Sequence, residues 1–195
     1  MLATEQIQDL IKTYGDSLFP VPITTYLSTT NRVIWGLLIN EDERQLEPYF
    51  GEIAALDMAQ FNQNFINSLA GYRTRARDYF PNLTADADVF LISKQCLDLP
   101  LPEVEALVIH ELCHWYIDSG LQSSKPLRAT NMDRIMARGL YNKTDQNNDR
   151  FHTLPFCELL CSVANKATRA GAKFPNRKEL VSLAMKYDVI GGFRV

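Results

Sequence analysis

Hydrophobic residues recur at helical spacing in several stretches of the chain. In the first stretch they predict an amphipathic helix over about residues 1–14, which Gly15 would close. The apolar residues of this stretch are Leu2, Ile7, Leu10, Ile11 and Tyr14. A second stripe predicts another helix that ends at Gly71, and it consists of Phe50, Ala54, Met58, Phe61, Phe65 and Leu69.

Two other regions carry the short apolar runs that are typical of strands. The runs 23–28 and 32–39 are rich in β-branched and aromatic residues, and they flank Thr29-Thr30-Asn31. This arrangement predicts a β-hairpin over 23–39. Further along, the run Val89-Phe90-Leu91-Ile92-Ser93 predicts one more strand.

The second half of the chain is predicted to be mainly helical. The strongest helix covers 102–118, with Pro102 in its first turn and Gly120 just beyond its end. Residues 121–150 are polar, and we expect a long surface loop with one helical turn around 132–140. Two more helices are expected, one from Thr153 to before Gly171 and one that opens with Asn176.

Length and composition favour one globular domain over residues 1–195. The chain has 195 residues, of which 46% are hydrophobic, so it can bury a sizeable core. No apolar run approaches the roughly 20 residues that span a bilayer, and the first residues lack the pattern of a secretory signal. For these reasons we expect no membrane partner. The four cysteines form no C-x-x-C pair, so we expect reduced thiols and a cytoplasmic protein.

Charge is distributed unevenly along the chain. Residues 1–120 hold 7 Lys/Arg against 17 Asp/Glu, a net of −10, whereas residues 121–195 hold 13 against 6, a net of +7. A basic second half could bind a polyanion such as DNA. The simpler interpretation is that two oppositely charged faces of one domain attract each other or are solvated.

The sequence His110-Glu111-Leu112-Cys113-His114 is an H-E-x-x-H motif inside the strongest predicted helix. Residues four apart lie on one helical face, so both imidazoles can reach one metal ion. Glu111 would project beside the metal, where it can accept a proton from water. The flanking residues are apolar, and burying His, Glu and His together is costly unless they are paired or metal-bound.

A catalytic zinc site normally takes three protein ligands, so the motif needs one more. His152 is the only other histidine of the chain, 38 residues after His114 and just before a predicted helix start. Asp118, Asp133 and Glu158 compete for this role. Asp118 could instead accept the second ring N–H of a ligand histidine.

The residues after the motif exclude several classes of metallopeptidase. A metzincin would need Gly and His where Ile117 and Gly120 stand, and residues 134–144 contain no acid that could serve as the third ligand of a gluzincin. Three segments of the chain resemble the SprT-like family of zinc peptidases, which includes the Spartan proteases. They are the strand 89–93 followed by Leu97, the helix from Val104 to His114, and His152-Thr153-Leu154-Pro155-Phe156.

The resemblance is strongest over 89–160 and implies an α+β fold of zincin type, with a small twisted sheet packed on the active-site helix. It implies that His110, His114 and His152 bind Zn²⁺ and that Glu111 is the catalytic base. The family's C-terminal zinc ribbon, which uses four cysteines, has no counterpart in this sequence. The last two cysteines, Cys157 and Cys161, are spaced four apart within a predicted helix.

The expected function is that of a zinc-dependent endopeptidase acting on a protein or peptide substrate, which an edge strand at 89–93 could hold by backbone pairing. Two alternatives stay open. One is a metal-bearing module that binds DNA or protein without cleaving it, and the other is a hydrolase of a non-peptide amide.

Overall fold

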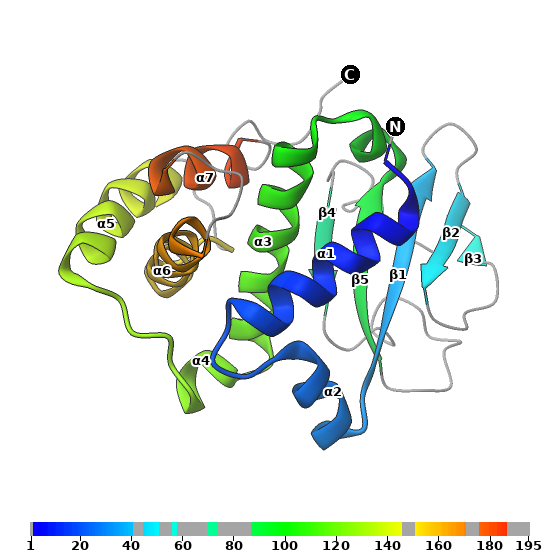
Figure 1. Cartoon of the computed structure of the whole chain (residues 1–195), viewed down its shortest axis with the longest axis horizontal. Coiled ribbons are helices and arrows are strands. Elements are labelled where there is room, and N and C mark those ends of the chain that lie inside the picture. Colours follow the sequence, from blue (N-terminus) through cyan, green and yellow to red (C-terminus); the bar gives the residue numbers. More distant parts are fainter. Residues whose placement is uncertain are drawn as a thin grey trace.

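The computed structural model describes residues 2–40, 45–50, 56–57, 70–73, 87–145, 151–170 and 176–186. Within these ranges the chain forms α-helices and a five-stranded sheet (Figure 1). The helices are α1 (Thr4–Ser17), α2 (Ile23–Thr30), α3 (Leu101–Asp118), α4 (Leu121–Ser124), α5 (Asn131–Asp145), α6 (Leu154–Arg169) and α7 (Arg177–Ala184), and a 3₁₀ turn, η4, covers Lys94–Asp98. The strands are β1 (Val33–Asn40), β2 (Gln45–Phe50), β3 (Leu56–Asp57), β4 (Ala70–Arg73) and β5 (Ala87–Ser93).

The strands lie in the order β3-β2-β1-β5-β4. The β1 and β5 strands pair in parallel, and the other neighbours are antiparallel. The predicted strand at 89–93 is therefore confirmed, and its residues 88–93 are all buried. The expectation that this strand is an edge is wrong, because β5 pairs on both sides. A substrate strand therefore cannot add to it.

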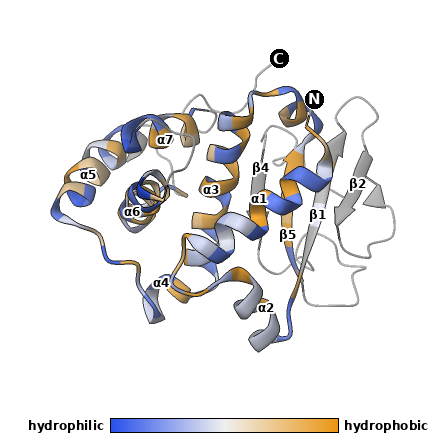
Figure 2. Cartoon of the chain, in the orientation of Figure 1, coloured by the Kyte–Doolittle hydropathy of each residue, from blue (hydrophilic) through white to orange (hydrophobic). Residues whose placement is uncertain are grey.

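Helix α3 forms the centre of the molecule, as Figure 1 shows, with the sheet on one side and α6 and α7 on the other. Hydrophobic residues recur along α3 (Figure 2), and the helix packs against β4, α1, α6 and α7. The helix begins at Leu101, with Pro102 in its first turn, and Gly120 follows its end with a φ of 76°. The prediction of this helix and its terminator is thus confirmed, and burial from several directions explains why apolar residues occur on more than one of its faces.

The predicted hairpin over 23–39 is wrong in its first half. Residues 33–40 are a strand, but 23–30 form helix α2, which ends where Asn31 adopts a left-handed conformation. Asp16 Oδ1 accepts hydrogen bonds from the backbone N–H and the hydroxyl of Thr24, at 3.0 and 2.9 Å. These contacts stabilise the first turn of α2 although its β-branched residues favour strands.

Part of the predicted helix between Phe50 and Gly71 is also wrong. Phe50 ends β2, Leu56–Asp57 forms β3, and Gly71 lies inside β4. Residues 51–55 and 58–69 lie outside the described residues. A strand alternates its side chains with a period of two, so the helical spacing of the stripe does not fit the described ends of this segment, which pair into the sheet.

The last part of the chain is more helical than expected. Residues 131–145, predicted as loop with a single turn, form the four-turn helix α5. The helices that begin after Thr153 and Asn176 are confirmed as α6 and α7, and Asn176 Oδ1 accepts the N–H of Glu179 at 2.9 Å. Among the described residues, no helix has the length and apolar character needed to cross a membrane.

Candidate metal centre

Two elements bring three histidines together. His110 and His114 lie one turn apart on α3, and His152 lies just before α6, which packs against α3. The Nε2 atoms of His110 and His114 are 3.1 Å apart, those of His110 and His152 are 3.1 Å apart, and those of His114 and His152 are 3.3 Å apart. Two ring nitrogens from α3 and one from a segment 38 residues further along the chain thus point at one another.

The spacing of these nitrogens fits a single tetrahedral ion. A zinc ion with N ligands at 2.0–2.1 Å in tetrahedral geometry places the nitrogens about 3.3–3.4 Å apart. The observed separations of 3.1–3.3 Å lie at this value or just below it. Imidazole nitrogen binds zinc, copper, iron and nickel, so the geometry supports a transition metal and does not by itself choose one.

The centre lies at the edge of the core. His110 and His152 are buried, with 1% and 5% of their surface exposed, whereas His114 is partly exposed. Among the three histidines, His114 is therefore the one that solvent reaches. The buried Phe156 ring packs against all three imidazoles, with ring centroids 4.3 Å from His114, 4.9 Å from His110 and 4.8 Å from His152.

Glu111 directly follows His110 on α3 and is buried, with 4% of its surface exposed. Successive residues of an α-helix are rotated by about 100°, so this carboxylate lies beside the histidine face and not on it. A buried carboxylate next to a metal site is placed to exchange protons with a bound water. The burial and the helical position are those that the sequence predicts for Glu111.

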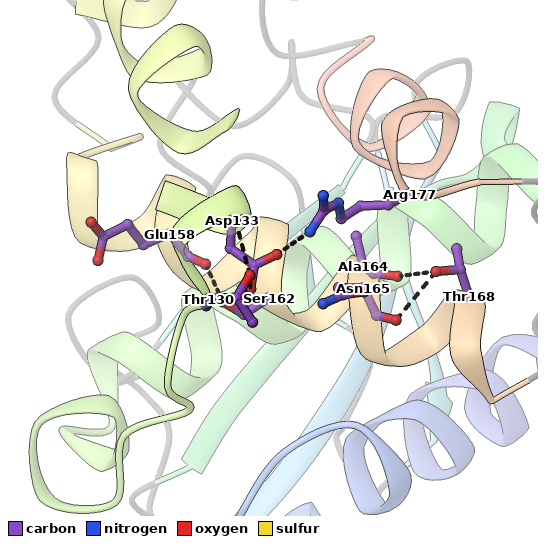
Figure 3. A network of polar contacts seen from close by, with 8 residues as sticks. All are labelled: Thr130, Asp133, Glu158, Ser162, Ala164, Asn165, Thr168 and Arg177. Atoms are coloured by element: carbon purple, nitrogen blue, oxygen red, sulfur yellow. Dashed lines mark hydrogen bonds and ion pairs between the residues drawn. The ribbon is translucent and has the colours of Figure 1, made fainter. Parts of the chain in front are cut away.

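The three acidic residues that compete with His152 do not belong to the cluster. Asp118 is exposed at the last position of α3. Asp133 forms an ion pair with Arg177, and its Oδ2 accepts hydrogen bonds from the backbone N–H and the hydroxyl of Thr130, at 2.7 and 2.8 Å (Figure 3). In the same figure the Glu158 carboxylate points away from this network. Among the described residues, the group of potential metal ligands within 4.8 Å of one another consists of His110, His114 and His152.

The four cysteines are free thiols in the core, as predicted. Burial is the largest effect that raises the pKa of the Cys113 thiol, and the nearby Cys161 and Glu111 raise it further. Burial also raises the pKa of Cys161 to about 12, and Asp133 adds to the increase. Both thiols stay protonated near neutral pH, so neither is a thiolate ligand or a nucleophile in this conformation.

Phe156 is the residue at this centre whose role sequence reasoning did not find. The sequence shows only that an aromatic residue follows His152 by four positions. Its contact with all three imidazoles depends on the packing of α6 against α3, which the sequence pattern does not specify. No protein-family model, no curated protein and no solved structure matches the chain.

Proposed function

We propose that this protein is a zinc-dependent endopeptidase of the SprT-like, zincin type. One observation supports this most: three imidazole nitrogens from α3 and the start of α6 lie 3.1–3.3 Å apart beside a buried glutamate. Three neutral imidazoles leave one tetrahedral position for water or substrate, which is the ligand arrangement of catalytic zinc sites. The buried free thiols agree with a reducing, cytoplasmic location, which is part of the proposal.

The residues of the centre have separate tasks in this proposal. His110, His114 and His152 would hold Zn²⁺, which supplies Lewis-acid polarisation of a scissile carbonyl and lowers the pKa of a coordinated water. Glu111 accepts the proton of the attacking water and transfers it to the leaving amine. The partly exposed side of His114 is where the peptide bond enters, since His110 and His152 are buried.

The test is Glu111→Gln, which preserves side-chain size and removes the base. We expect unchanged zinc content and thermal stability, and cleavage of a casein substrate reduced by roughly 10²–10⁴-fold, the usual contribution of a general base. Glu103→Gln is the matched control, because Glu103 lies in the first turn of the same helix and its carboxylate pairs with Lys186. It should cleave casein at the wild-type rate. Equal cleavage by wild type and Glu111→Gln would refute the catalytic assignment.

A second candidate function is that of a metal-bearing module that binds DNA without cleaving a substrate. The observation that favours it is the surface of α4, α5 and the loop between them. Residues 121–145 contain two acids, Asp133 and Asp145, of which Asp133 is buried, and five exposed basic residues: Lys125, Arg128, Arg134, Arg138 and Lys143. DNA binding that falls steeply with salt, in a protein with no casein cleavage, would favour this candidate.

A further inference from the structure

The aromatic ring of Phe156 contacts every imidazole of the metal centre. It stacks on His114 with an interplanar angle of 25°, and it is tilted by 59° to His110 and by 68° to His152. Phe156 is fully buried in the first turn of α6. The Phe156 ring therefore bounds one side of the space that the three imidazole rings occupy, and we call this side the Phe156 wall.

This wall limits the ways in which the three rings can turn. An imidazole rotates about its side-chain bonds, and a metal site loses affinity when its ligands must be ordered at the moment of binding. The phenyl ring has no hydrogen-bonding atom, so it restricts the imidazoles without competing for their nitrogens. It also keeps water from that side of the site.

The neighbouring residue supports the same arrangement. The Cys157 thiol donates a hydrogen bond to the backbone carbonyl of His152, with the sulfur 3.7 Å from the oxygen. This contact ties the segment that carries His152 to the first turn of α6. The backbone N–H of Cys157 also donates a hydrogen bond to the carbonyl oxygen of Thr153, at 3.0 Å. The first turn of α6 is therefore hydrogen-bonded from the residue that directly follows His152.

We propose that Phe156 is a positioning residue that preorganises the three histidines for metal binding. The inference rests on the proposed function, because it assumes that the histidines bind zinc. A side chain of this kind acts through the ligands and not on the substrate. Outer residues that orient metal ligands typically change metal affinity by about 10–100-fold when they are replaced.

The experiment compares Phe156→Leu with Phe19→Leu. Phe19 is a suitable control because it is also a buried phenylalanine that packs on α3, against Trp115 and Tyr116, but it contacts none of the histidines. For each folded apo protein, zinc affinity is measured by competition with a fluorescent chelator, thermal stability is measured by circular dichroism, and the visible spectrum of the Co²⁺ form is recorded.

We expect Phe156→Leu to bind zinc about 10–100-fold more weakly than wild type and to give a weaker tetrahedral Co²⁺ band. Phe19→Leu should lose thermal stability and keep the wild-type affinity and spectrum. If Phe156→Leu does not fold, Phe156→Met, which fills the volume with an unbranched chain, is measured by the same criteria.

Wild-type zinc affinity in the folded Phe156 variant overturns the inference and leaves the proposed function intact. An equal loss of affinity in both variants also overturns it, because the effect would then be one of general packing. A wild-type protein that binds no zinc removes the proposed function and the inference together.

Discussion

His152 lies 38 residues after His114 in the chain and 3.3 Å from it between the Nε2 atoms. This contact decides whether the H-E-x-x-H pair has a third partner. Asp118, one of the three acids that compete with His152 by sequence, is exposed at the end of α3 and lies outside the cluster. The structure therefore favours His152, as the resemblance does.

Replacing His152 tests this assignment. His152→Ala should bind zinc far more weakly than wild type, because water replaces the lost ligand. Asp118→Asn should keep wild-type affinity, or lose at most about 10–100-fold if it orients a ligand. The measurement is chelator competition on folded protein. Tight binding by His152→Ala together with metal-free Asp118→Asn would reverse the two assignments.

The sequence predicted His110 and His114 as one pair and His152 as a candidate third member beside three acids, but it did not predict the geometry that brings the three histidines together. The spacing of His110 and His114 on a helix follows from helical periodicity. His152 could be proposed because the chain has no other histidine. The support from Phe156 could not be predicted, since it depends on how two helices pack.

The sequence-based predictions of helices α5 and α2 were wrong for reasons that lie in those helices themselves. Helix α5 is predominantly polar outside, and its buried side is narrow, with Asp133 and Ala137 as its fully buried residues. Its start does carry a recognisable signal, because Thr130 and Asp133 form a capping box in which each side chain accepts the other's backbone N–H. Helix α2 has no comparable signal within itself, since its cap comes from Asp16.

Gly15 determines how closely helix α1 can pack against helix α2. The sequence suggests that it ends the first helix, but α1 continues through it to Ser17. A Cβ atom at this position would lie 2.7 Å from Ile23 Cγ2, so the glycine permits close contact between α1 and α2.

Alanine substitutions at two helical glycines should therefore have opposite effects. Gly15→Ala should lower the free energy of unfolding by about 1–3 kcal/mol, the usual cost of overpacking. Gly139→Ala in α5 is the control, because a Cβ there meets nothing within 4 Å, and it should stabilise by about 0.4–1 kcal/mol. Denaturant unfolding measures both. A stabilising Gly15→Ala would contradict the close packing of α1 on α2.

For the whole molecule, topology was the feature least accessible from sequence. The pairing of β1 with β5 joins Val33 to Ala87, so it depends on a contact between residues more than fifty positions apart. No local pattern encodes such a pairing. The burial of α3 was easier to predict, because the residues that flank the H-E-x-x-H motif are apolar.

The buried thiols predict how the stability of the whole fold depends on pH. In the unfolded chain a thiol loses its proton near pH 8.5, whereas Cys161 in the fold keeps it until about pH 12. Between these values the unfolded state binds fewer protons than the folded state, so stability falls as pH rises. Burial raises the pKa of Cys113 and Tyr14 as well, which acts in the same direction.

Urea unfolding at pH 7, 9 and 10 should therefore give decreasing free energies of unfolding. Cys161→Ala should start from a lower stability at pH 7 and lose less of it by pH 10 than wild type does. The same dependence on pH in both proteins would show that the Cys161 thiol is not the buried, protonated group that the structure describes.

The central claim is that the three histidines form one zinc site, and metal content measures it most directly. Protein purified without chelator, or incubated with zinc and desalted, is analysed by mass spectrometry of the metal against protein concentration. We predict about one zinc per chain in wild type and its loss in both His110→Ala and His114→Ala. Folded wild-type protein that carries no zinc and takes none up would contradict the account.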